Sequence, residues 1–184
     1  NISQNDSLSA SGLLRADAQS GIELNNPANQ VHAFRGNLTG AGHIDLANTL
    51  GVPLDVQNTS TTNGGITIVS SGGISTSGLV AANGGALSMT SNSPLTIGAS
   101  GASANGNIVL TATNLTSAGN MVLNGNVSSS TGAVTLNAAG TLTQNGAVSG
   151  PTGISATSGG ATTFGPTASV SGTPVSYVAA GTPV

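Results

Sequence analysis

Two carboxylic acids in this chain are spaced so that they could act together. Glu23 and Asp45 are each the central residue of a short apolar-x-apolar motif, and they are 22 positions apart. If the two motifs stack as parallel strands, the carboxyl groups lie about 5 Å apart, as in a retaining glycosidase. No aromatic platform for a sugar ring is visible nearby, and the only cations are Arg15 and Arg35. We therefore expect a solvated edge and assign no catalytic residue.

Two histidines, His32 and His43, raise the question of a metal site. They are 11 positions apart, about half of the repeat described below, so we expect them on different faces. A weak metal site that combines His43 with Asp45 is the alternative to two surface histidines, which we favour. The Gly-Gly-x-Gly-x-Asp repeat, which binds calcium in some secreted proteins, is absent. We expect no metal ion and no cofactor.

Charge is confined to the start of the chain. All seven charged residues fall in the first 55 positions, and no Lys, Arg, Asp, Glu or His occurs from 56 to 184. The side chains that serve acid–base, metal and phosphate chemistry are therefore missing from most of the chain. We expect no nucleic-acid partner. The chain contains no run of about 18 to 20 apolar residues, so we expect no membrane insertion. We expect any secretion signal to lie outside this chain.

Composition favours an ordered chain over a disordered one. Disordered chains combine low hydrophobicity with high charge, whereas this chain has a mean hydropathy of +0.20, 37% hydrophobic residues and a net charge of −3. It has no cysteine, so disulfides contribute nothing to its stability. Stability must come from regular burial and backbone hydrogen bonds.

A short apolar-x-apolar motif recurs along the chain. Its first residues are 22, 22, 21, 21, 26 and 20 positions apart. Strand side chains alternate, so the first and third residues of each motif point inward and the central residue points outward. The predicted inward stack consists of Ile22 and Leu24, Ile44 and Leu46, Ile66 and Ile68, Leu87 and Met89, Ile108 and Leu110, Val134 and Leu136, and Ile154. The predicted outward column is Glu23, Asp45, Thr67, Ser88, Val109, Thr135 and Ser155.

Asn-Gly pairs form a second series. Their spacings are 20, 22, 19 and 21 positions. The pair is favoured where the backbone needs a positive φ, so we interpret it as one repeated turn. The predicted turn residues are Asn63-Gly64, Asn83-Gly84, Asn105-Gly106, Asn124-Gly125 and Asn145-Gly146.

Each repeat contains further apolar positions after the motif. The second set is Ile74, Leu95 with Ile97, Leu115 and Leu142, and the third is Leu79, Leu123 with Val127, Val148 and Val170. Three short strands in a fixed repeat predict one turn of a parallel β-solenoid. The fold class is therefore all-β: a right-handed parallel β-helix of about eight turns of roughly 21 residues, about 40 Å long.

The repeat also sets the expected organisation of the chain. Residues 1–21 form an N-terminal flank or first turn, 22–173 the β-helix repeats, and 174–184 a C-terminal tail or connection to a next segment. The spacing of 26 predicts a bulge or longer corner between Thr111 and Thr131, with Met121-Val122-Leu123 as a strand.

The chain resembles the filamentous haemagglutinin-like exoproteins, which are bacterial adhesins exported by two-partner secretion. The resemblance rests on three segments: Gly21-Ile22-Glu23-Leu24-Asn25-Asn26-Pro27-Ala28-Asn29; Phe34 followed by Ile44-Asp45-Leu46-Ala47-Asn48 with Leu50-Gly51; and Gly-x-Val/Ile-x-Leu repeats such as Gly132-Ala133-Val134-Thr135-Leu136. It covers residues 20 to 172. It implies a β-helical shaft, secretion to the cell surface, and a role in adhesion or biofilm formation. The family's N-terminal secretion domain and C-terminal toxin module are absent from this sequence.

The expected function is thus the structural shaft of an extracellular or cell-surface fibre, without catalysis. The expected partners are further copies or segments of the same protein, stacked end to end, and surface glycans or proteins of a host or of bacteria. A self-assembling filament subunit is one alternative. A polysaccharide-active β-helical enzyme using Glu23 and Asp45, and an ice-binding solenoid using the outward Thr and Ser column, are the others.

Overall fold

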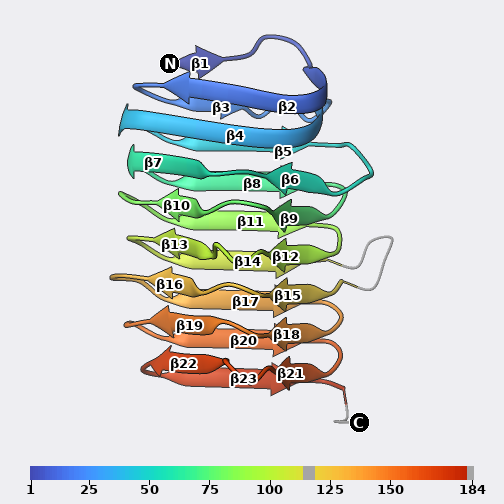
Figure 1. Ribbon diagram of the computed structural model, residues 1–184, viewed down its shortest axis with the longest axis vertical. Coiled ribbons are helices and arrows are strands. Elements are labelled where there is room, and N and C mark those ends of the chain that lie inside the picture. Colours follow the sequence, from blue (N-terminus) through green and yellow to red (C-terminus); the bar gives the residue numbers. More distant parts are fainter. Residues whose placement is uncertain (114–118, 182–184) are drawn as a thin grey trace.

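The chain folds into a stack of short parallel strands. A computed structural model describes residues 1–113 and 119–181, and within these ranges all 23 elements are β-strands. The strands wind as a right-handed parallel β-helix, whose turns lie one below another from the N-terminal to the C-terminal end (Figure 1). The predicted fold class is therefore confirmed. No helix in the described part of the chain is long and apolar enough to cross a bilayer.

One side of the rod is a nine-stranded parallel sheet, here called face A. Adjacent strands in this sheet come from successive turns, which explains why the apolar-x-apolar motif recurs once per turn. Its strands are β1 (Ile2–Ser3), β3 (Ile22–Leu24), β5 (Ile44–Asn48), β8 (Ile66–Ser70), β11 (Leu87–Ser91), β14 (Ile108–Ala112), β17 (Val134–Ala138), β20 (Ile154–Ser158) and β23 (Val175–Ala179).

The other side begins with two long strands, β2 (Ser9–Ala18) and β4 (Gln30–Ala41). Strand β4 pairs with both β6 and β7, so below it each long strand is replaced by two short ones separated by a corner. Face B consists of β6 (Leu54–Val56), β9 (Ile74–Thr76), β12 (Leu95–Ile97), β15 (Met121–Leu123), β18 (Leu142–Gln144) and β21 (Thr162–Phe164). Face C consists of β7 (Thr59–Asn63), β10 (Val80–Ala82), β13 (Ala102–Ala104), β16 (Val127–Ser129), β19 (Ala147–Gly150) and β22 (Ser169–Gly172).

The register of face A agrees with the prediction from the motif spacing. Ile44 pairs with both Ile22 and Ile66 in the ladder, and their side chains are fully or almost fully buried. The remaining predicted inward residues of the stack are buried as well. The central residues pair from Glu23 through Asp45 and Thr67 to Ser155 on the outside of the sheet.

Faces B and C depart from the prediction in three places. Leu79 is 42% exposed, and the inward position of its turn is taken by Val80, which is fully buried. Leu123 belongs to β15 on face B, not to the third set. Leu115 lies outside the described residues, and Met121 pairs with Leu95 in the face B ladder instead. These short apolar runs carry no alternation that would identify which residue points inward.

The solenoid includes strand β1 within residues 1–21, where a flank or a first turn was expected, and strand β23 within 174–184, where a tail or connection was expected. Strand β1 pairs with β3, and β23 pairs with β20. The inward positions of β23 are taken by Val175 and Tyr177. The aliphatic motif does not include an inward tyrosine, which explains why sequence reasoning stopped one strand early.

The irregular turn has its extra residues at one corner. Strand β14 ends at Ala112 and β15 begins at Met121, whereas β11 ends at Ser91 and β12 begins at Leu95 one turn earlier. The connection is therefore five residues longer. This confirms the predicted longer corner and the Met121–Leu123 strand. The residues 114–118 within this corner lie outside the described part of the chain.

Candidate functional site

The two acids that suggested catalysis are neighbours in the ladder of face A. Glu23 pairs with Asp45 directly, and Thr67 follows in the next turn. Glu23 is exposed and Asp45 is half-buried. The one aromatic ring on this half of the rod, Phe34, is fully buried and presents no platform beside them.

The two histidines lie on different elements. His32 is on β4, where its Nδ1 lies 3.2 Å from the carbonyl oxygen of Ala10. His43 precedes β5, and its Nδ1 accepts a hydrogen bond of 3.2 Å from the backbone N–H of Gly65. Among the described residues no group of three His, Cys, Asp or Glu side chains could hold a metal ion.

The five Asn-Gly pairs occupy two different corners, which corrects the prediction of one repeated turn. The pairs at Asn63, Asn83 and Asn105 end or follow strands of face C, whereas those at Asn124 and Asn145 follow strands of face B. In the next turn the position of Asn105 is taken by Ser130, because Ala104 pairs with Ser129 and the N–H of Ser130 donates to Ala104 O. The 19 positions from Asn105 to Asn124 therefore lead from the corner after face C to the corner after face B, and do not correspond to one full turn.

The expectation that these pairs supply a positive φ is also wrong. None of the ten residues has a positive φ; the described glycines that do are Gly21, Gly42, Gly101, Gly119 and Gly153. The glycines of the pairs are needed for close stacking instead. A Cβ on Gly64 would overlap the carbonyl oxygen of Gly42, and one on Gly146 would overlap that of Gly125. Successive turns touch backbone to backbone at these corners.

A buried polar column, which sequence reasoning missed, supports the corner that follows face A. Asn48 accepts a 2.7 Å hydrogen bond from the backbone N–H of Val31 and donates to Ser70 Oγ at 3.5 Å. Asn29, in the turn above, donates to Leu24 O at 2.8 Å. Asn48, Ser70 and Ser91 are the fifth residues of β5, β8 and β11, so their common offset from the motif could have revealed the column.

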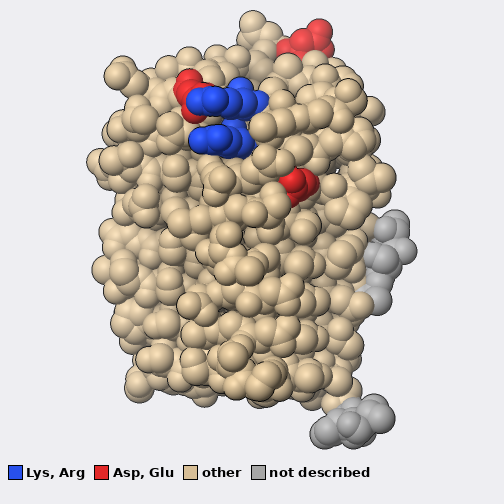
Figure 2. All heavy atoms as spheres, viewed as in Figure 1, with Lys and Arg blue, Asp and Glu red and all other residues tan. Residues whose placement is uncertain are grey.

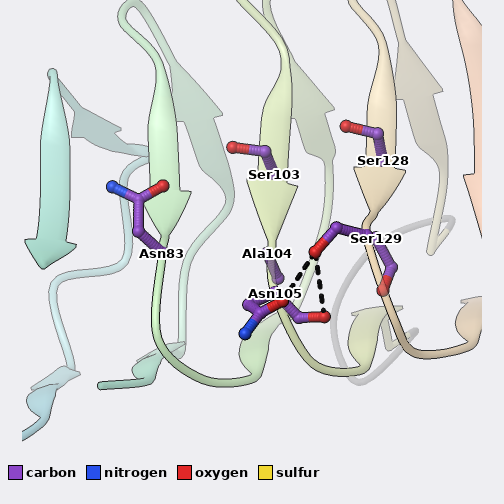
Figure 3. A pocket seen from close by; sticks show the side chains of 7 residues that line it. Asn83, Ser103, Ala104, Asn105, Ser128 and Ser129 are labelled. Atoms are coloured by element: carbon purple, nitrogen blue, oxygen red, sulfur yellow. Dashed lines mark hydrogen bonds between the residues drawn. The ribbon is translucent and has the colours of Figure 1, made fainter. Parts of the chain in front are cut away.

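A polar groove lies on face C where the chain turns toward face A. It has a volume of about 380 Å³ and includes Asn83, Ser103, Asn105 and Ser128. Ser103 on β13 and Ser128 on β16 are ladder partners and point the same way (Figure 3). Asn105 Oδ1 accepts a 2.7 Å hydrogen bond from Ser130 Oγ. The groove therefore presents neutral hydroxyl and amide groups and no charge.

A larger, mostly apolar groove of about 660 Å³ lies beside face A. It runs past Pro27, Gly51, Val69 and Thr90 toward the corner at Thr113. Val69 points outward and is 45% exposed. Every side chain that lines this groove is uncharged as well.

The last turn leaves its inward-facing side chains uncovered. Phe164 is 52% exposed, Val170 37% and Val175 47%, although their ladder partners Gln144, Val148 and Ile154 are 0 to 3% exposed. Among residues 1–113 and 119–181, the strands β21, β22 and β23 each have a pairing partner on one side only.

An aromatic and polar cluster connects this last turn to the interior of the turn before it. The Tyr177 hydroxyl donates a 2.7 Å hydrogen bond to Gln144 Oε1, and the rings of Phe164 and Tyr177 are 5.3 Å apart. Gln144 is fully buried and its Nε2 donates to two carbonyl oxygens, those of Gly146 and Ser169. Burial raises the pKa of Tyr177 to about 12.

Comparison with known proteins adds no family. No protein-family model, no curated protein and no solved structure matches this chain.

Proposed function

We propose that this chain is a structural segment of a rod-shaped, extracellular bacterial fibre and acts as a shaft without catalysis. The observation that carries the proposal is the C-terminal turn. Phe164, Val170 and Val175 continue the three inward columns and are partly exposed, while the same columns are covered in the preceding turns. In the preceding turns, from β3 to β20, the next solenoid turn covers the residues of these columns.

The backbone of the last turn is also suited to pairing with a further solenoid turn. Its three strands present unpaired edges, and a parallel strand about 4.8 Å away would satisfy their N–H and C=O groups. Side chains from 56 to 184 carry no charge, so approaching surfaces of similar turns repel one another little. The partner at this end is therefore a further segment or a further copy of the same protein.

The adhesive role rests on the resemblance to filamentous haemagglutinin-like exoproteins and on the neutral surface. The groove of Asn83, Ser103 and Ser128 offers hydroxyl and amide groups that suit a neutral sugar or a peptide backbone. Repetition of such groups once per turn would add avidity to weak single contacts. Host or bacterial surface glycans or proteins are the partners of this kind.

Surface localisation gives the direct test of the fibre. Antibodies raised against the purified chain are applied to intact cells of the source bacterium and located by immunogold electron microscopy. Labelling along filaments on unbroken cells is expected. Labelling that appears only after lysis would contradict an extracellular role.

A self-assembling filament is the second candidate, favoured by the same exposed end. The purified chain should then form rods in multiples of about 40 Å, the length estimated from the ladder spacing. Val170→Asp should abolish this association, because it places a charge on the stacking surface. Ser171→Asp, the outward neighbour on β22, is the matched control. Monomeric wild-type chain at high concentration in sedimentation velocity would reject self-assembly.

The two remaining alternatives have less support. Glu23 and Asp45 have no exposed aromatic ring beside them, and the exposed ring of Phe164 lies in the last turn. The outward Thr and Ser column that an ice-binding surface requires is interrupted by Val109 and begins with the two acids.

A further inference from the structure

The only two cations of the chain lie side by side. Arg15 and Arg35 are the sole Lys or Arg residues in the sequence, and they are direct partners in the ladder between β2 and β4. Both flank inward positions, since Ala16 and Gly36 beside them are buried. Like charges directly opposite each other destabilise a sheet. Folding alone therefore gives no reason to place both cations in one pair.

The two guanidinium groups are incompletely satisfied. Arg15 Nε donates to Asp17 Oδ2 at 2.6 Å, which leaves its two terminal nitrogens for another acceptor. Arg35 makes neither an ion pair nor a hydrogen bond within residues 1–113 and 119–181, and its Nε is buried without an acceptor. Leaving a buried donor without an acceptor costs stability.

The acid in the turn below does not neutralise Arg35. Asp55 pairs in the ladder with Ala33, and its Oδ2 accepts a 2.8 Å hydrogen bond from Gln57 Nε2. In Figure 2 the two cationic side chains lie next to each other toward the N-terminal end, and the lower half of the visible face carries no charge. The pair is thus the one place on the rod with adjacent positive groups.

We propose that Arg15 and Arg35 together bind the oxyanion of an acidic saccharide, either a uronic-acid carboxylate or a sulfate ester. A guanidinium presents parallel N–H groups that match two oxygens of such an anion. An oxyanion held between the two groups removes their mutual repulsion. The Arg15 side chain is 60% exposed and Arg35 is partly exposed, so a sugar polymer reaches the pair without a deep pocket.

The charge pattern distinguishes a saccharide from a nucleic acid. Binding to nucleic acid requires several Lys or Arg residues along a closely spaced phosphate backbone. Here the two cations are followed only by uncharged turns, which suit a polymer with sparse acidic groups and many hydroxyls. The anion site depends on the register of β2 and β4 and on the incompletely satisfied guanidinium groups, and not on a role of the chain as a shaft.

Nuclear magnetic resonance gives a clean test, because a chain with two arginines has two arginine Nε–Hε signals. The intact chain is titrated with glucuronate and, separately, with glucose 6-sulfate, against glucose and sodium chloride at matched ionic strength. Both signals should shift along one saturable curve with an acidic sugar, and the arm that saturates first identifies the anion. Linear shifts equal to those with chloride would overturn the site.

A charge-conserving variant separates recognition from simple attraction. Arg35→Lys keeps the positive charge but loses the planar fork, so the affinity should fall at least about tenfold, as read from the remaining Arg15 signal. Glu23→Gln on face A is the control and should leave binding unchanged. Unchanged affinity in Arg35→Lys would refute the clamp. If that variant does not fold, the wild-type titration still decides.

Discussion

The Tyr177 hydroxyl donates a hydrogen bond across the interior to Gln144 Oε1, two residues that are 33 positions apart in the sequence. This contact joins face A to face B at the end of the rod, where the inward column of face A changes from Ala156 to a tyrosine. The fully buried Gln144 Oε1 thereby finds its donor in the half-buried Tyr177 hydroxyl.

Removing this contact should destabilise the last turns. Tyr177→Phe keeps the ring against Phe164 but leaves the buried Gln144 Oε1 without its donor, so unfolding should cost about 1–3 kcal/mol less. Urea titration followed by circular dichroism measures the change. Ser176→Ala, the outward neighbour on β23, is the control and should shift the midpoint little. Equal midpoints for Tyr177→Phe and wild type would contradict the contact.

The same tyrosine predicts a loss of stability in alkaline solution. Burial raises its folded-state pKa to about 12 from 10.0, so the folded chain retains a proton that the unfolded chain releases. Its contribution is fully present below about pH 10 and declines as the pH rises to about 12. Thermal unfolding midpoints between pH 9 and 12 should therefore fall less steeply in Tyr177→Phe. A parallel decline would show that other groups cause it.

Backbone stacking at the corners predicts a contrast between two glycines. A methyl group on Gly64 would overlap the carbonyl oxygen of Gly42, whereas one on Gly51 would meet open space. Gly64→Ala should lower the unfolding free energy by about 1–3 kcal/mol, because backbone cannot move aside as a side chain can. Gly51→Ala should be neutral or slightly stabilising. The opposite order in chemical denaturation would refute the stacking argument.

The ladder register predicts a second contrast on face A. Ile66→Asp places a charge in an apolar stack without a partner or water, so the loss should reach about 4 kcal/mol or more. Thr67→Asp, on the outward column, should cost no more than about 1 kcal/mol, because its carboxylate stays in water and meets only the repulsion of its ladder partner Asp45. Denaturant midpoints of the two variants measure the difference. Similar midpoints would rule out this register.

The buried polar column predicts that replacing a buried asparagine lowers the free energy of unfolding more than replacing an exposed one. Asn48→Ala leaves the backbone N–H of Val31 without its acceptor inside the rod, which should cost about 1–3 kcal/mol. Asn137→Ala removes an exposed 3.1 Å contact with Thr157 Oγ1 and should cost little. Differential scanning calorimetry of both variants provides the measurement. A larger loss in Asn137→Ala would contradict a structural role for the column.

The sequence by itself determined the fold class, the repeat length and the face A register. The reason is that Ile22, Ile44 and Ile66 occupy identical positions in successive turns, and alternation within a strand fixes which side chains are buried. The longer corner before Met121 was predictable for the same reason, because an insertion interrupts an otherwise constant spacing.

Only the tertiary structure decided the corners, the end and the cation pair. The Asn-Gly pair has the same sequence at either corner, so the sequence does not show which corner it occupies. Gly64 is required because a side chain there would overlap the backbone of Gly42 in the turn above. Similarly, the residues around Arg15 do not indicate that it lies beside Arg35. A bulge between Ala10 and Leu13 shifts the register of β2 against β4 before the two arginines pair. These features depend on contacts between turns, and a contact between turns is set by the winding of the whole chain and not by the residues next to it in sequence.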